Sequence, residues 1–169
     1  MSPGHPWLIH MLREMMREPA SKTPDARFDA AMQELITTLG GKQMSNHDLQ
    51  AAFEKHLPAD LRYESRVSLD WFFDGWVNGS AVPSFSLKSV QAGARRNNRP
   101  VFTGKIVEND APEQLVTSLP IYGESANPEA APLYLGRVFV DETETSFTIF
   151  APPGTRKLLL DPYRAVLRK

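Results

Sequence analysis

Apolar side chains recur at helical spacing in three stretches near the start of the chain. The stretches are His5 to Arg17, Pro24 to Gly40-Gly41, and Ser45 to Pro58. Residues three and four apart share one face of a helix, so each stretch predicts an amphipathic helix. The expected buried positions are Trp7, Leu8, Met11, Leu12, Met15 and Met16 in the first, Phe28, Met32, Leu35, Ile36 and Leu39 in the second, and Leu49, Ala52, Phe53 and Leu57 in the third.

Helix-terminating residues accompany these stretches. Thr23 is the expected N-cap of the second helix, with Pro24 at its first position, and Gly40-Gly41 ends it in a left-handed turn. Ser45 is the expected N-cap of the third helix, and Asp48 completes a capping box three residues later.

A fourth helix, rich in aromatic residues, is expected over Ser68 to Gly79. Ser68 is the predicted N-cap, and Pro83 prevents continuation of the helix. Trp76 is expected to be buried where two modules of the chain meet, whereas Trp71 is offset around the helix and expected to stay partly exposed. The predicted buried face consists of Leu69, Phe72, Phe73 and Trp76.

After Ser80 the hydrophobic period changes from helical to alternating, which predicts β-strands. Six or seven short strands in roughly 90 residues are typical of an immunoglobulin-like sandwich. The sequence therefore predicts an α+β fold, with a helical module at 1–79 and an antiparallel β-sandwich at 80–169. The alternating runs are Phe85/Leu87, Val101–Val107, Leu115–Ile121, Leu133–Val140 with a bulge at Gly136, Phe147/Ile149 and Leu158/Leu160.

Composition excludes several classes of function. Nineteen Lys plus Arg against twenty Asp plus Glu give a net charge of −1, and no basic stripe indicates a nucleic acid or membrane surface as partner. No apolar run is long enough to span a bilayer. With no Cys, the chain has no disulfide, thiol nucleophile or Cys-ligated metal. The cellular compartment stays open.

The histidines do not form a recognisable metal motif. His5 and His10 are five residues apart, and His47 and His56 are nine apart, so neither pair shares a helical face in the manner of H-E-x-x-H. We interpret all four as ordinary surface or half-buried histidines. The segment Gly123-Glu124-Ser125 also lacks the second glycine of a serine-hydrolase elbow. The sequence therefore predicts no catalytic, cofactor-binding or metal-ligating residue in this chain.

Two charged clusters admit a functional and a structural interpretation. Asp141, Glu142 and Glu144 fall in a predicted hairpin turn, where solvation explains them. The basic cluster Arg95–Arg99 has the charge to bind a phosphate or an acidic surface. An exposed polar loop between strands is the simpler interpretation. The Met-rich first helix is interpreted as core, with a partner groove as the alternative.

The aromatic helix also carries a resemblance. Leu69, Phe72-Phe73, Trp76-Val77 and Pro83, followed by an apolar strand, resemble the end of the helical region in the aminopeptidase N family. These proteins are gluzincin zinc metallopeptidases in which a β-sandwich often follows. The closing Leu158–Tyr163 segment resembles the family's last strand, which ends in an Asp-Pro pair.

The start of the chain continues this resemblance. Gly4 and the apolar run after it are similar to the family's helix beyond the catalytic tyrosine, but the tyrosine and lysine positions are either missing or replaced by Met1-Ser2-Pro3. The start of the third helix, at Ser45 to Asp48, is similar to a helix start in the family. The resemblance implies that the chain begins just beyond the chemistry.

The resemblance implies a C-terminal part whose helices wall the active-site cleft and whose sandwich acts as a spacer. The resemblance implies zinc, a peptide substrate and an upstream catalytic domain as partner only for a full-length parent. This chain is therefore expected to be inactive alone and to hold no cofactor. Two alternatives stay open: a free-standing protein or peptide interaction module, and an unfamiliar enzyme that uses Asp, Glu and His from the turns. Self-association through an exposed helical face also stays open.

Overall fold

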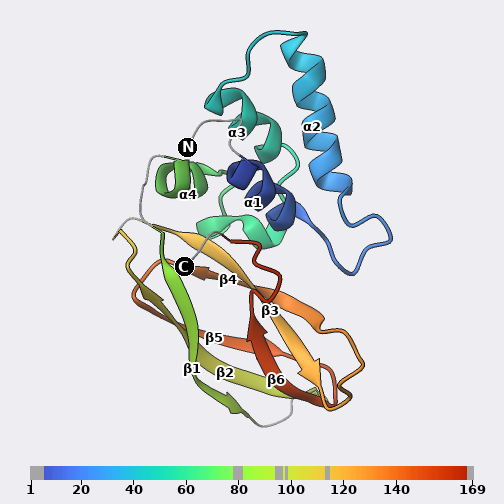
Figure 1. Cartoon of the computed structure of the whole chain (residues 1–169), viewed down its shortest axis with the longest axis vertical. Helices are drawn as coiled ribbons and strands as arrows, with labels where there is room; N and C mark the ends of the chain where they lie inside the picture. The colour runs from blue at the N-terminus through green and yellow to red at the C-terminus, as the bar shows by residue number, and fades with distance from the viewer. Residues whose placement is uncertain (1–5, 78–81, 94–96, 98, 113–114, 167–169) are drawn as a thin grey trace. The chain divides into compact units, whose positions relative to one another are not determined.

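The chain forms two compact units, Met1–Ser80 and Ala81–Lys169. The computed structural model describes residues 6–77, 82–93, 97, 99–112 and 115–166. The first unit is helical and the second holds two antiparallel sheets (Figure 1), so the expected α+β class is confirmed. The expected module boundary at residues 79 and 80, including the helix exit at Gly79, lies outside the described residues.

All three amphipathic helices are present in the helical unit. They are α1 (Pro6–Met16), α2 (Ala26–Leu39) and α3 (Asn46–Glu54). Two single 3-10 turns follow, η1 (Ala59–Leu61) and η2 (Tyr63–Ser65). The aromatic segment then forms α4 (Asp70–Phe72) and continues as one wider π-helical turn, η3 (Phe73–Val77).

The helix ends match the predicted capping residues in part. The capping box at Ser45 is confirmed: its hydroxyl accepts the Asp48 N–H at 3.1 Å, and the Asp48 carboxylate accepts the Ser45 N–H at 2.9 Å. Gly40 ends α2 with φ of 55°. The predicted N-cap at Thr23 is wrong, because α2 begins after Asp25, whose carboxylate accepts a bond from Arg13 at 3.1 Å instead of capping the helix.

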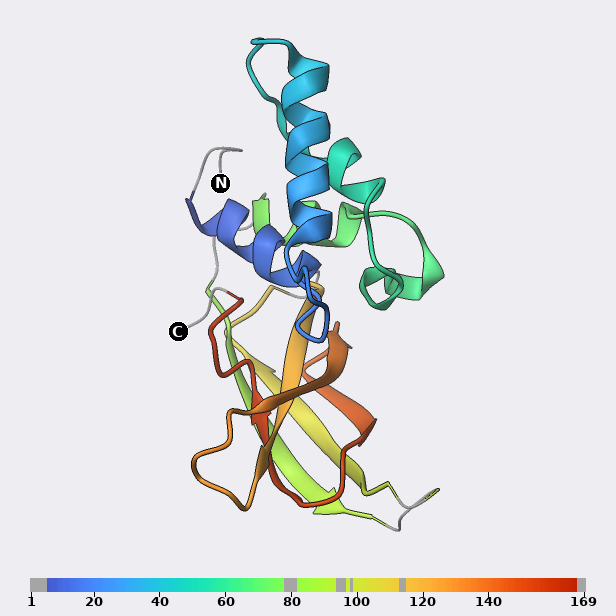
Figure 2. The ribbon, with the colours of Figure 1, turned by 90° about the vertical axis from the view of Figure 1, so that its right-hand side faces the viewer.

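The core of the helical unit combines α1, α3 and the aromatic helix. α2 packs on α3 (Figure 2), and the rings of Phe28 and Phe53 lie 5.7 Å apart. Two predicted core positions are wrong: Trp7 is 41% exposed and Ile36 is 63% exposed. The buried face of α2 runs through Ala31 and Leu35, so Ile36 lies one step further around the helix. Fully buried side chains include Leu8, Met11, Leu12, Met16, Leu49, Phe53, Leu61, Leu69 and Phe72.

The start of the aromatic helix differs from the prediction at Ser68. Leu69 is the N-cap residue, and the Ser68 hydroxyl only accepts the Asp70 N–H, at 3.1 Å. The Leu69 N–H donates to the Glu54 carboxylate of α3 at 2.9 Å, and Gln50 donates to Asp70 at 2.6 Å. Side chains of α3 therefore form the hydrogen bonds at the start of the aromatic helix that the predicted N-cap, Ser68, was expected to form.

The predicted exposure of Trp71 is also wrong. Trp71 is 8% exposed and Trp76 is 2% exposed. The Trp71 ring meets Phe72 edge-on at 5.9 Å, and Phe72 meets Phe73 at 5.3 Å. The predicted face of Leu69, Phe72, Phe73 and Trp76 is buried as expected, so the helix is buried on more than one face. The placement of Trp76 between the two modules stays a prediction.

The described residues of the second unit form six strands in two three-stranded antiparallel sheets. Figures 1 and 2 show how these strands are arranged. One sheet has the order β1-β2-β5 and the other β4-β3-β6. Each of the six predicted runs forms a strand, and β3 extends to Ser125, four residues beyond the predicted run that ends at Ile121. The strands are β1 (Ser84–Ala92), β2 (Val101–Asn109), β3 (Thr117–Ser125), β4 (Leu133–Val140), β5 (Glu144–Phe150) and β6 (Thr155–Leu160).

Local features of the sheets follow the sequence closely. Ile121 lies opposite Gly136 and Tyr122 opposite Tyr134, so β4 carries one extra residue and the bulge predicted at Gly136 is confirmed. A Cβ atom at Gly104 would lie 3.0 Å from the Phe147 ring, which explains why this buried position lacks a side chain.

A buried carboxylate holds the segment that follows β6. Asp161 is fully buried, and its carboxylate accepts the N–H groups of Ala165 at 2.8 Å and Val166 at 3.1 Å. Its own N–H donates to the Pro120 carbonyl of β3 at 2.9 Å, and its φ of 43° is left-handed. One side chain thus satisfies two backbone donors that would otherwise be buried without an acceptor.

Asp161→Ala is expected to lower the free energy of unfolding by about 2–4 kcal/mol, because it leaves two buried N–H groups unpaired. Asp161→Asn keeps one acceptor oxygen and tolerates the left-handed backbone, so its loss is expected to be smaller. Urea unfolding of both variants measures the difference. Equal losses for the two variants would show that these two hydrogen bonds do not account for the stability.

Candidate functional site

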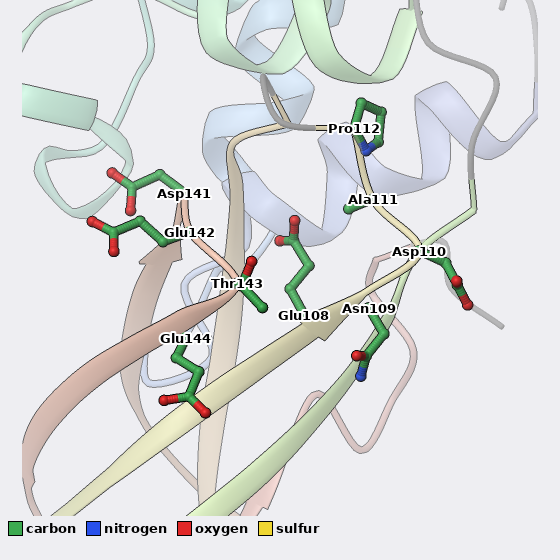
Figure 3. Close-up of a pocket in the computed structure, with 9 residues that line it drawn as sticks. All are labelled: Glu108, Asn109, Asp110, Ala111, Pro112, Asp141, Glu142, Thr143 and Glu144. Carbon is green, nitrogen blue, oxygen red and sulfur yellow. The ribbon is translucent and has the colours of Figure 1, made fainter.

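The described residues include one large polar depression, which we call the acidic hollow. It is formed by two segments, 108–112 and 141–144 (Figure 3). Its volume is about 660 Å³. All nine lining residues belong to the β unit. Five of them are acidic and none is basic: Glu108, Asp110, Asp141, Glu142 and Glu144.

Strand pairing brings the two segments of the acidic hollow together. β2 pairs with β5, with Val107 opposite Glu144, and the Glu108 N–H donates to the Thr143 carbonyl at 2.8 Å. The turn at Asp141–Thr143 joins β4 of one sheet to β5 of the other. After β2, Asp110 adopts a left-handed φ of 61°, which ends the strand and turns the chain toward Pro112.

Glu108 differs from the other acidic residues because it is buried. Only 8% of the residue is exposed, and its Oε2 atom has no hydrogen-bond partner among the described residues. Its side chain extends from the end of β2 into the space between the two segments (Figure 3). Burial, with a smaller contribution from the negative charge of Asp141, raises the pKa of Glu108 to about 7. Glu108 therefore exchanges its proton close to neutral pH.

The remaining carboxylates of the acidic hollow are exposed. Glu144 forms ion pairs with Lys88 and Lys105, each at 3.4 Å, and these two partners lower its pKa. Figure 3 shows the Glu144 side chain directed away from that of Glu108, and those of Asp141 and Glu142 directed outward from the turn. The acidic hollow thus has one buried carboxylate at its centre and a rim of exposed acidic groups.

A turn is present at residues 141–143, but the predicted hairpin is wrong, because β4 and β5 belong to different sheets and Glu144 begins β5. Glu108 was not predicted as a site residue. Its signal lies in the alternation of β2, in which Phe102, Gly104 and Ile106 are buried and Glu108 takes the next inward position. A carboxylate on the inward face of an otherwise apolar strand is unusual, because burial of an unpaired charge is costly.

The described histidines occupy ordinary structural positions. His56 lies 2.8 Å from Glu34, which also binds Lys55 at 2.6 Å, and both partners lower the Glu34 pKa. The His10 ring meets Trp7 edge-on at 5.5 Å. His5 lies outside the described residues. Within the described ranges, no group of three His, Cys, Asp or Glu side chains is arranged to hold a metal ion.

The basic cluster at Arg95–Arg99 is described only at Asn97 and Arg99. The Arg99 guanidinium lies 5.8 Å from the centre of the exposed Phe150 ring, a cation–π geometry. Both described residues of the cluster are exposed. The rest of this segment lies outside the described residues, so a phosphate or an acidic partner for it stays a hypothesis.

Two searches for known relatives leave the chain without an assigned family. Neither the comparison with protein-family models nor the search of curated proteins finds a match. No helix in the part of the chain that the structure describes combines the length and apolar character needed to cross a membrane.

Proposed function

We propose that the chain is the non-catalytic C-terminal part of a gluzincin aminopeptidase-like zinc metallopeptidase. In this proposal the helices at 1–79 wall the cleft of the parent enzyme, and the β unit at 80–169 acts as a structural spacer. The partners in that setting are the catalytic domain of the same protein and, through it, a peptide substrate.

The observation that carries the proposal is the burial of the aromatic motif on which the resemblance rests. Leu69 and Phe72 are fully buried, and Phe73 and Trp76 are nearly so. These residues are core side chains of the helical unit, and an antiparallel strand, β1, begins at Ser84 soon after them. A buried aromatic helix followed by a β unit is the order of elements that the resemblance implies.

The β unit supports an immunoglobulin-like sandwich as part of this proposal. Its described strands form two three-stranded antiparallel sheets, and alternate positions of β2 are buried. A segment of this length with short strands at regular spacing suits a sandwich of two sheets.

The residues of this chain do not fit a gluzincin zinc site. Such a site needs two histidines four apart on one helix and a glutamate from a later helix. Among the described histidines, His10 lies in α1 and His47 in α3, whereas His56 follows α3. We therefore derive no catalytic step for this chain, and we assign the chemistry to the parent enzyme.

The purified chain is expected to hold no stoichiometric zinc and to leave aminoacyl-anilide substrates uncleaved. The physical reason is the missing pair of histidines at ligand spacing. Elemental analysis and an anilide assay measure the two quantities, with an active gluzincin aminopeptidase as the positive control. One tightly held zinc per chain, together with hydrolysis that a chelator abolishes, would overturn the non-catalytic assignment.

A free-standing interaction module is the second candidate function, and the acidic hollow favours it. A buried carboxylate without a hydrogen-bond partner on one oxygen is costly to maintain in a domain that acts only as a spacer. Such a group is more readily explained where a partner supplies the missing donor.

A further inference from the structure

We propose that the acidic hollow binds the ammonium group of a lysine side chain carried by a basic peptide, with Glu108 as the anchoring carboxylate. This inference does not depend on the metallopeptidase proposal, because every residue of the site lies in the β unit.

The anchor is the buried side chain of Glu108. More than nine tenths of this residue is buried, its Oε2 atom lacks a hydrogen-bond partner, and the side chain extends into the space between the two segments (Figure 3). A cationic donor placed there would supply the missing hydrogen bond and the opposite charge together. Charge-assisted hydrogen bonds of this kind are stronger than neutral ones.

The lining of the acidic hollow is complementary to a cation. Its five titratable residues are all acidic, and no lysine, arginine or histidine lines it. Glu144 is balanced by Lys88 and Lys105, so the attraction comes mainly from Glu108. Like charges gathered around one depression raise the local concentration of cationic ligands.

The size and geometry of the site favour lysine over a metal ion or arginine. A volume of about 660 Å³ suits an organic group, and no three carboxylates of the described part of the chain converge as a metal site requires. Arginine binds best to a carboxylate that offers both oxygens to its planar fork. The buried Oε2 atom of Glu108 suits the compact ammonium of lysine, which needs only one acceptor oxygen.

Binding of this cation is expected to release a proton near neutral pH. The other titratable groups that line the acidic hollow are Asp110 after β2, Asp141 and Glu142 in the turn, and Glu144 at the start of β5. All of them are acidic, and the negative charge of Asp141, together with burial, favours the protonated form of Glu108 when the hollow is empty. An ammonium group favours the ionised form, so affinity is expected to fall as the pH is lowered through 7.

NMR titration of the whole chain tests the proposal with two capped pentapeptides, acetyl-Gly-Gly-Lys-Gly-Gly-amide and the same peptide with Nε-acetyl-lysine. The lysine peptide is expected to produce saturable shifts at the amides of 108–111 and 141–144, and to lower the pKa of the Glu108 carboxyl by about one unit. The acetylated peptide is expected to produce neither, because it lacks the charge.

Two variants make this test specific. Glu108→Gln is expected to weaken lysine-peptide binding at least about fivefold at pH 8. Glu124→Gln removes a carboxylate of β3 that pairs with Arg156 outside the hollow, and is expected to leave binding unchanged. Equal shifts with both peptides, no saturable shift with either, or unchanged affinity in Glu108→Gln would overturn the proposal. Displacement of the lysine peptide by 1 mM Ca²⁺ or Mg²⁺ would overturn it in favour of a metal site.

Discussion

Replacing Glu108 with glutamine is expected to raise the free energy of unfolding at pH 8 by about 1–3 kcal/mol. In the native chain, burial of the Glu108 carboxyl raises its pKa from 4.5 to about 7. At pH 8 the folded protein must keep this group ionised in a buried position. Glutamine has nearly the same shape but no charge, so the substitution removes that penalty.

The pH dependence of this effect has a defined sign. The folded state binds more protons than the unfolded state between about pH 4.5 and 7, so stability falls as the pH rises through this window. Below pH 4.5 the Glu108 carboxyl is protonated in both the folded and the unfolded state, and its contribution to the free energy of unfolding is fully present. The advantage of Glu108→Gln is therefore expected to vanish at pH 4 and to reach its maximum above pH 7.

Urea unfolding of the native chain and Glu108→Gln at pH 4 and pH 8 measures this difference. Glu142→Gln is the matched control, because it removes an exposed carboxylate from the rim of the same hollow and is expected to change stability by less than about 0.5 kcal/mol. A difference between the native chain and Glu108→Gln that is the same at both pH values would show that Glu108 keeps an ordinary pKa.

Truncation of Trp76 to alanine is expected to cost about 3–5 kcal/mol, a large part of the stability of a small domain. Its side chain is 2% exposed within the aromatic helix. Trp71 is 8% exposed, so Trp71→Ala is expected to be similarly severe, rather than to cause the small loss that a solvent-facing Trp71 would give. Both losses arise from the cavity that a removed indole leaves.

Denaturant unfolding of all three Trp→Ala variants measures these costs. Trp7 is the matched control because it is 41% exposed, and its truncation is expected to cost about 1 kcal/mol or less. Trp76→Phe is expected to cost less than Trp76→Ala, because the buried Trp76 Nε1 has no hydrogen-bond partner and its removal leaves no acceptor unpaired. A loss for Trp7→Ala as large as that for Trp76→Ala would contradict the burial on which both expectations rest.

The accuracy of the sequence predictions depended on whether a feature was local. The capping box at Ser45, the glycine end of α2 and the bulge at Gly136 are set by neighbouring residues, and all three were predicted. The alternating runs located every described strand but could not give the sheet orders, because pairings such as β2 with β5 join distant parts of the chain.

The errors arose where local periodicity gave way to tertiary structure. Trp71 was misplaced because the aromatic helix is buried on more than the one face that its periodicity indicates. Ser68 was misassigned because Glu54 of α3 accepts the N–H at the helix start. The acidic turn at Asp141 was predicted, but its position beside Glu108 follows from the pairing of β2 with β5. A pattern within one strand shows that Glu108 faces inward, but not what surrounds it.

The most direct test of the proposed function is the intact mass of the native protein that ends in this sequence. A small affinity tag placed after Lys169 at the genomic locus allows the protein to be isolated from its own cells. We predict a product substantially longer than 169 residues, which contains an H-E-x-x-H motif upstream of the present sequence and carries zinc. A product of 169 residues that accumulates without any longer form would contradict the proposal and favour the interaction module.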